Sequence, residues 1–172
     1  MEVILSGNIN NIKKIKMGNL IKSPSPIEVD NNFKSVFLAG TIGIDSKNVE
    51  DWQQYVSEKL SDYALNIYNP RRDKWEGSLE QNMDNIDLKN QINWELDALE
   101  KSDFILMNIL GNSQSPISLL EFGMFAKSGK MLVSCPKEFY RYGNIQVMCY
   151  RYNVPLYNNV DDLLNDFLKN YL

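Results

Sequence analysis

Glu121 is the only ionisable residue in the otherwise apolar segment 115–126, and it is here that we place the chemistry. Ser115 and Pro116 predict the start of a helix, because serine caps exposed amides and proline suits the first helical position. We expect this helix to be buried on most of its faces, so its carboxylate must be hydrogen-bonded, protonated or facing a cavity. Gly123 leaves room for a ligand or another backbone to approach. The alternative is a core helix whose one glutamate reaches solvent.

A second carboxylate becomes important because the sequence contains no histidine. This absence excludes Ser-His-Asp and Cys-His nucleophile systems and the usual zinc sites. Acid–base work would then fall on carboxylates, Tyr, Lys, Cys or the substrate itself, and no metal or cofactor is expected. Glu95 shares a predicted helix face with Ile92 and Leu99, which is unusual for a carboxylate. The alternative is that Glu95 lies at the edge of this apolar stripe and is solvated.

Two further groups of residues suit anion or base recognition. Arg71, Arg72 and Trp75 lie in one short loop, which is suited to binding phosphate through guanidinium groups or stacking a base on the indole. A solvated basic loop anchored by the tryptophan is the alternative. Ser115 and the free amides of the following helix form a candidate anion site, although simple capping would also explain this serine.

The elements that position these residues alternate between short apolar strands and amphipathic helices. Strands are predicted at residues 35–39, 64–68, 103–109, 131–135 and 154–157. Helices are predicted at residues 48–63, 86–101, 115–126, 144–152 and 160–171, the first with a stripe formed by Trp52, Val56, Leu60 and Tyr63. This alternation predicts an α/β fold with a parallel sheet covered on both faces.

The carboxyl ends of the predicted strands carry the most unusual residues of the chain. Gly40 and Thr41 follow the first strand, although they lack the pattern of a P-loop or of a dinucleotide-binding turn. Ligands of parallel α/β proteins gather outside the carboxyl ends of the strands. Because the helix of Glu121 starts at the same edge, its position favours a functional role.

Length and composition predict one soluble α/β domain within residues 34–172, preceded by a peripheral or flexible extension, residues 1–33. The 172 residues carry a formal charge of −4, which argues against binding to nucleic acids or anionic membranes. No segment has the length of a membrane span and no signal peptide is recognisable, so a cytoplasmic location is expected. Cys135 closes an apolar run and is interpreted as a small buried hydrophobic residue.

A series of short motifs follows one another in a defined order along the chain. They are Phe37-Leu38-Ala39-Gly40-Thr41-Ile42, Trp52, Asn69-Pro70-Arg71-Arg72 with Trp75, Trp94-Glu95, Ser102-Asp103, Ser115-Pro116 and Leu120-Glu121-Phe122-Gly123. In order and spacing they resemble the nucleoside 2-deoxyribosyltransferase-like proteins, from about Lys34 to Pro155.

This resemblance implies a flavodoxin-like (Rossmann-like), mostly parallel five-stranded sheet with helices on both faces. It also implies a homo-oligomer whose sites are completed by a neighbouring chain. Glu121 matches the family's nucleophilic glutamate, and Glu95 falls where an acidic residue contacts the nucleoside. Asn144 resembles the asparagine that reaches into the adjacent subunit's site.

The sequence departs from the family pattern at three points. Phe37 stands where the family often has a tyrosine that hydrogen-bonds the nucleophile. Ser115 stands where the transferases carry an aspartate and the related 2′-deoxynucleoside 5′-phosphate hydrolases a phosphate-binding serine. Those hydrolases also use an arginine directly after Gly-Ser-Ile, whereas Gly43 and Ile44 follow here.

Three functions remain open from the sequence. The leading hypothesis is cleavage or transfer at the N-glycosidic bond of a (deoxy)nucleoside through a covalent glycosyl ester of Glu121, with Glu95 delivering the proton. The alternatives are a nucleoside 5′-monophosphate N-glycosidase and a non-catalytic nucleotide-binding or assembly module. The residues predicted to bind the substrate are Phe37, Gly40, Thr41, Arg71, Arg72, Trp75, Ser115 and Asn144.

Overall fold

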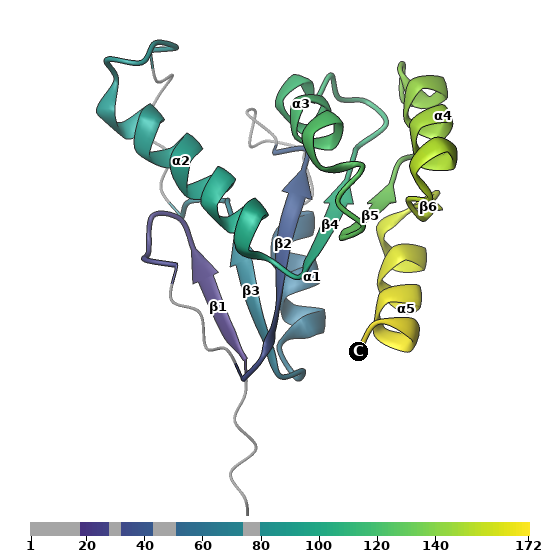
Figure 1. Ribbon diagram of the computed structural model, residues 1–172, viewed down its shortest axis with the longest axis horizontal. Coiled ribbons are helices and arrows are strands. Elements are labelled where there is room, and N and C mark those ends of the chain that lie inside the picture. Colours follow the sequence, from purple (N-terminus) through teal and green to yellow (C-terminus); the bar gives the residue numbers. More distant parts are fainter. Residues whose placement is uncertain (1–17, 28–31, 43–50, 74–79) are drawn as a thin grey trace, which may run out of the picture.

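The computed structural model describes residues 18–27, 32–42, 51–73 and 80–172, and these residues build a twisted sheet between two layers of helices (Figure 1). The strands are β1 (Asn19–Lys22), β2 (Lys34–Gly40), β3 (Leu65–Asn69), β4 (Phe104–Asn108), β5 (Met131–Ser134) and β6 (Leu156–Tyr157). The helices are α1 (Trp52–Leu60), α2 (Ile86–Lys101), α3 (Pro116–Phe125), α4 (Tyr142–Tyr152) and α5 (Val160–Asn170). Among these helices, none is long and apolar enough to cross a membrane.

The six strands are all parallel and lie in the order β1-β3-β2-β4-β5-β6. The expected α/β class, flavodoxin-like with helices on both faces, is therefore confirmed. The sheet has one strand more than the five predicted, because β1 was not recognised. The chain moves from β2 to β3 in one direction and returns to β4 on the other side of β2. This reversal creates a topological switch point between β2 and β4, where parallel α/β proteins bind ligands.

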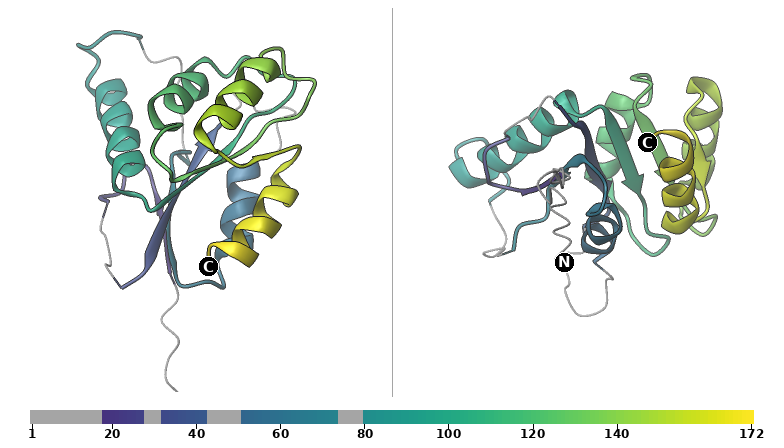
Figure 2. Two further views of the ribbon diagram at one scale, coloured as in Figure 1. Left: turned by 45° about the vertical axis from the view of Figure 1, so that its right-hand side comes forward. Right: turned by 90° about the horizontal axis from the view of Figure 1, so that it is seen from below.

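Alternate residues of each strand point to opposite faces, so the sheet separates two apolar cores. Phe37 and Ala39 of β2 face the layer formed by α2, α3 and α4, whereas Val36 and Leu38 face α1 and α5. The three helices of the first layer and the two of the second lie on opposite sides of the sheet in the rotated views of Figure 2. Strands buried on both faces explain the nearly continuous apolar runs in the sequence.

The helices agree with the sequence in position but not always in the face that they bury. Trp52, Val56 and Leu60 of α1 are buried, as predicted, whereas Tyr63, the fourth member of the predicted stripe, lies beyond the end of the helix and is 38 % exposed. In α2, the predicted stripe is partly wrong, because Ile92 is 44 % exposed while Gln91 lies buried in its place. The buried positions of α2 are Gln91, Trp94, Ala98 and Leu99, which follow the spacing of a helix packed on one side.

Helix α3 differs most from the expectation of burial on most of its faces. Only Ser118 and Phe122 are buried, whereas Ile117, Leu120 and Met124 are 61, 62 and 53 % exposed. A single helix laid on a sheet buries only one stripe, so the outer side of α3 remains uncovered in one chain.

Strand β1 belongs to the segment 1–33 that was expected to be a peripheral or flexible extension. It pairs in parallel with β3 along the edge of the sheet, and the Ser23 amide extends this pairing to the Asn69 carbonyl at 3.2 Å. The indole Nε1 of Trp94 in α2 donates to the Ser25 carbonyl oxygen at 2.7 Å. Residues 18–27 are thus part of the fold, while residues 1–17 lie outside the described part of the chain.

Candidate active site

The backbones of β2 and β4 come unusually close at the switch point. Gly40 ends β2 with a φ of +130°, and a Cβ atom there would lie 2.1 Å from the Asn108 carbonyl oxygen. The same oxygen accepts a 2.9 Å hydrogen bond from the Thr41 amide. Only glycine combines this backbone conformation with so close an approach. Gly40 therefore sets where the chain leaves the sheet, and with it the position of Thr41.

Three hydroxyl groups meet directly above this point. Thr41 Oγ1 lies 2.6 Å from Ser115 Oγ and 3.2 Å from Ser113 Oγ, and the two serine oxygens are 2.7 Å apart. Thr41 Oγ1 also accepts a hydrogen bond from the Leu110 amide, and Ser113 Oγ donates to the Leu110 carbonyl. We call Thr41, Ser113 and Ser115 the hydroxyl cluster. It joins the ends of β2 and β4 to the start of α3.

Ser115 does not cap α3 through its side chain, contrary to the sequence-based expectation. It occupies the N-cap position in the left-handed conformation, with φ 45° and ψ 48°, and its hydroxyl bonds to the cluster instead. Pro116 does begin the helix, as predicted. The first amides of α3 consequently have no partner from this serine, and such amides attract anions.

Glu121 lies one and a half turns into α3 and is partly buried. No residue in the described part of the chain donates a hydrogen bond to its carboxyl group. Burial raises the pKa of Glu121 from its ordinary value of 4.5 to about 8, and the charge of Glu95 adds to this rise. A pKa of about 8 favours the protonated form of the Glu121 side chain at neutral pH.

Glu95, on the neighbouring helix α2, lies in a different polar environment. Burial raises its pKa as well, but a 2.7 Å hydrogen bond from Gln91 Nε2 and the positive charge of Arg72 both lower it. Glu95 thus has a donor and a cation that stabilise its ionised form, and Glu121 has neither. The two carboxyl groups interact electrostatically, so they titrate as a coupled pair in which Glu121 is the last to lose its proton.

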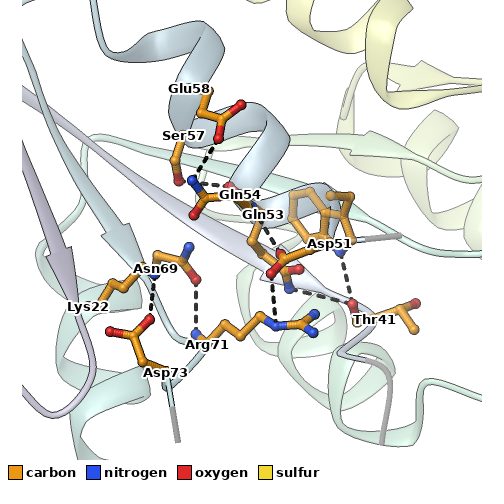
Figure 3. A network of polar contacts seen from close by, with 11 residues as sticks. Lys22, Thr41, Asp51, Gln53, Gln54, Ser57, Glu58, Asn69, Arg71 and Asp73 are labelled. Atoms are coloured by element: carbon orange, nitrogen blue, oxygen red, sulfur yellow. Dashed lines mark hydrogen bonds and ion pairs between the residues drawn. The ribbon is translucent and has the colours of Figure 1, made fainter. Parts of the chain in front are cut away.

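The two arginines of the predicted loop point to different parts of this site. The Arg71 amide donates to Asn69 Oδ1 at 2.9 Å, and its guanidinium Nε pairs with Asp51 Oδ2 at 3.1 Å beside Thr41 (Figure 3). Its buried Nη1 has no hydrogen-bond partner in the described structure. Arg72 instead donates through Nε to Gln91 Oε1, close to Glu95.

The remaining predicted site residues are distributed unevenly. Phe37 is buried, with its ring centroid 6.5 Å from that of Trp94 on α2, so it forms part of the apolar wall. Asn144 is exposed at the start of α4 and lines a hollow of about 300 Å³ with Leu119 and Phe122 of α3; Glu121 does not line it. Trp75 lies outside the described residues.

The structure thus unites most of the predicted residues in two adjoining groups. One contains Glu121, Glu95 and Arg72, and the other contains Thr41 and Ser115, with Arg71 nearby. Gln91 and Ser113 also belong to these groups but were not predicted from the sequence. A glutamine four residues before Glu95 and three before Trp94 was the available signal, because this spacing places Gln91 on the buried stripe.

A family model for proteins described as nucleoside 2-deoxyribosyltransferase like matches residues 33–139. The chain belongs to this family. The match spans most of the sheet and includes both glutamates, both arginines and the hydroxyl cluster. Asn144 and β1 of this nucleoside 2-deoxyribosyltransferase-like protein lie outside it. No curated protein sequence matches the chain.

Proposed function

We propose that the protein cleaves the N-glycosidic bond of a (deoxy)nucleoside and transfers the sugar through a covalent ester with Glu121. The observation that carries this proposal is the coupled carboxyl pair of Glu121 and Glu95 beside the switch point. Membership in a nucleoside 2-deoxyribosyltransferase-like family supports the substrate class. Retaining glycosyl transfer needs two carboxyl groups of different character, one as nucleophile and one as proton donor.

The proton of the pair has a defined role in the first half of the reaction. In the empty site it resides on Glu121, so it must move before Glu121 can attack as a carboxylate. Transfer to Glu95 leaves one ionised nucleophile and one acid. The Glu121 oxygen then forms a bond to the anomeric carbon, the bond from this carbon to the base nitrogen breaks, and Glu95 protonates the departing base.

The second half of the reaction reverses these roles. An acceptor base attacks the anomeric carbon, loses its proton to Glu95 and releases Glu121 as a carboxylate. Two successive inversions give net retention. The apolar wall that includes Phe37 and Trp94 excludes water from the ester, which favours transfer over hydrolysis.

A nucleoside 5′-monophosphate is the second candidate substrate, because of one specific observation. The hydroxyl of Ser115 is directed into the hydroxyl cluster at the start of α3, and the buried Nη1 of Arg71 has no described partner. Hydroxyls, helix amides and a guanidinium are the groups that bind phosphate. Ser115→Ala should then lower kcat/KM for monophosphates at least about tenfold and leave that for nucleosides within about twofold.

A homo-oligomer with shared sites is the assembly that we propose. The exposed apolar side of α3, formed by Ile117, Leu120 and Met124, suits burial against a second copy of the chain. Leu120→Lys should produce a smaller species in light scattering coupled to size exclusion. Leu172→Lys, at a leucine 46 % exposed outside α3, is the matched control. A Leu120→Lys protein of unchanged mass would refute this interface.

The deciding experiment supplies each deoxynucleoside and each 5′-monophosphate, with and without a free acceptor base, and follows products by chromatography. Wild-type protein should form a new nucleoside when an acceptor is present, and Glu121→Ala should form none. Base release from monophosphates alone would select the N-glycosidase. Release that persists in Glu121→Ala would refute the proposed nucleophile. The absence of any product would leave the non-catalytic binding module as the better explanation.

A further inference from the structure

Gln91 is a buried residue whose side-chain amide lies at the centre of a polar network. The reaction proposed above assigns no role to this residue. Its side chain, on the sheet-facing stripe of α2, is only 3 % exposed. Oε1 accepts hydrogen bonds from Ser23 Oγ, at 2.5 Å, and from Arg72 Nε. Nε2 donates to the Pro70 carbonyl, at 3.0 Å, and to Glu95 Oε1, at 2.7 Å.

These four hydrogen bonds use the full capacity of the amide group. A glutamine side chain offers two acceptor positions on oxygen and two donor hydrogens on nitrogen. The neighbours also fix which way round the amide lies. Arg72 can only donate, the Pro70 carbonyl can only accept, and the ionised Glu95 carboxylate can only accept, so a reversed amide would face all three with the wrong group.

We propose that Gln91 is the positioning residue of this site, which holds the Glu95 carboxylate beside Glu121 and anchors it to residues 18–27 through Ser23. The proposal rests on the proposed function for its catalytic consequence. Its structural part, the restraint of Glu95, stands independently of the reaction.

The anchoring segment lies outside the family match, which begins at residue 33. Ser23 is itself buried, and its amide donates a hydrogen bond to the carbonyl of Asn69, the last residue of β3. The neighbouring Ser25 carbonyl accepts a hydrogen bond from Trp94, one turn of α2 beyond Gln91. Residues 18–27 therefore make two hydrogen bonds to α2, one at Gln91 and one at Trp94, and these restrain the helix that carries Glu95. A free peripheral extension would not have them.

The groups that face Glu95 determine how the loss of Gln91 would be observed. Glu121 on α3 repels its charge, Arg72 from the loop after β3 attracts it, and Gln91 donates to it. Removing the donor while the repulsion remains raises the pKa of Glu95 and frees its side chain to rotate. Both changes follow from the contacts of Gln91 alone.

The test uses Gln91→Leu, which keeps the volume and removes all four hydrogen bonds. We expect kcat to fall by roughly tenfold to a hundredfold with a smaller change in KM, because a misplaced catalytic group mainly affects the chemical step. The acidic limb of the pH profile should move upward by about one unit. Carbon-13 NMR of labelled glutamate, with Glu95 assigned from Glu95→Gln, should report the same upward movement without substrate.

The control is Asn85→Ala, which removes the N-cap of the same helix, where Asn85 Oδ1 accepts from the Leu88 amide at 3.1 Å. It should lower the melting temperature without moving either the pH profile or the Glu95 titration. Gln91→Leu that behaves like this control would overturn the proposal. If Gln91→Leu does not fold, Gln91→Met removes the same donor without adding a charge and should give the same upward movement in the pH profile.

The NMR readout separates the two possible failures. A wild-type protein without activity on any nucleoside would refute the proposed function and leave the Glu95 titration as the test of positioning. An active wild type whose Glu95 signal is unchanged in Gln91→Leu would refute the positioning role alone.

Discussion

Replacing Glu121 by glutamine should stabilise the protein at alkaline pH, and this prediction needs no substrate. Glu121 has a pKa of about 8 in the folded chain and an ordinary value of 4.5 when exposed. Between these values the folded protein holds a proton that the unfolded chain releases. The free energy of unfolding of the wild type therefore falls as the pH rises through this window. Glutamine carries no charge at any pH, so Glu121→Gln escapes that loss.

The size of the effect follows from the same two values. One pH unit corresponds to about 1.4 kcal/mol for a group that binds a proton in only one of the two states. The full window would give about 5 kcal/mol for an isolated group. Partial exposure of Glu121 and local relaxation reduce this, so we expect Glu121→Gln to be about 2–3 kcal/mol more stable than wild type at pH 8.5. Near pH 4.5 the two proteins should differ by less than about 0.5 kcal/mol.

Urea denaturation at pH 4.5, 6.5 and 8.5 would measure this difference. Glu100→Gln, at an exposed glutamate of α2, is the matched control for the chemical change and should alter stability by less than about 0.5 kcal/mol. A Glu121→Gln advantage that does not grow between pH 4.5 and 8.5 would show that Glu121 does not hold a proton in the folded protein. The proton-transfer step that we propose would then lose its starting state.

Three further predictions address other parts of the site. Glu95→Gln should lower the pKa of Glu121 but keep it above 4.5, because burial is the larger cause of the rise. An NMR titration that finds no decrease would show that the two carboxyl groups do not interact electrostatically. In wild type, kcat/KM should decline above about pH 8 as the pair loses its last proton, and an activity that continues to rise at pH 9 would contradict the proton's role. Gly40→Ala should lower the free energy of unfolding by at least about 2 kcal/mol, because its Cβ would collide with the backbone of Asn108. Gly123→Ala, whose Cβ would lie in open space on α3, should leave that free energy unchanged or raise it. Denaturant unfolding of both variants measures the difference.

The arrangement of the sheet could be predicted from the sequence because buried parallel strands leave a strong pattern. The apolar runs of β2 to β6 were recognised, and three of the four residues in the predicted stripe of the first helix are buried, the exception being Tyr63. β1 was missed because Asn19–Lys22 is short, has polar residues at both ends and is half exposed at the edge of the sheet. An edge strand needs only one apolar face and one neighbour, so its sequence contains little periodicity.

The sequence predicted which residues to consider for the candidate site, but not the hydrogen bonds that connect them. Glu121 was found because a carboxylate in an apolar helix is rare, and Glu95 because it lies near a buried stripe. Gln91 was missed because a buried glutamine is recognised by its partners, and these come from Ser23 and the loop after β3, far away in sequence. The exposed side of α3 was mistaken for core, because an apolar composition alone does not tell whether a helix face is covered within its own chain.

In the reaction that we propose, the asymmetry between α2 and α3 explains how one site could hold a nucleophile and an acid. Glu95 is restrained by Gln91 and faces Arg72, whereas the described residues provide no donor for Glu121. An ionised carboxylate without a donor is unstable in a buried place, so Glu121 keeps its proton until a substrate arrives. The positive charge that develops on the sugar in the transition state then supplies the missing partner. Under this proposal, the environment that disfavours the ionised form of Glu121 without substrate makes the same carboxylate reactive once substrate is bound.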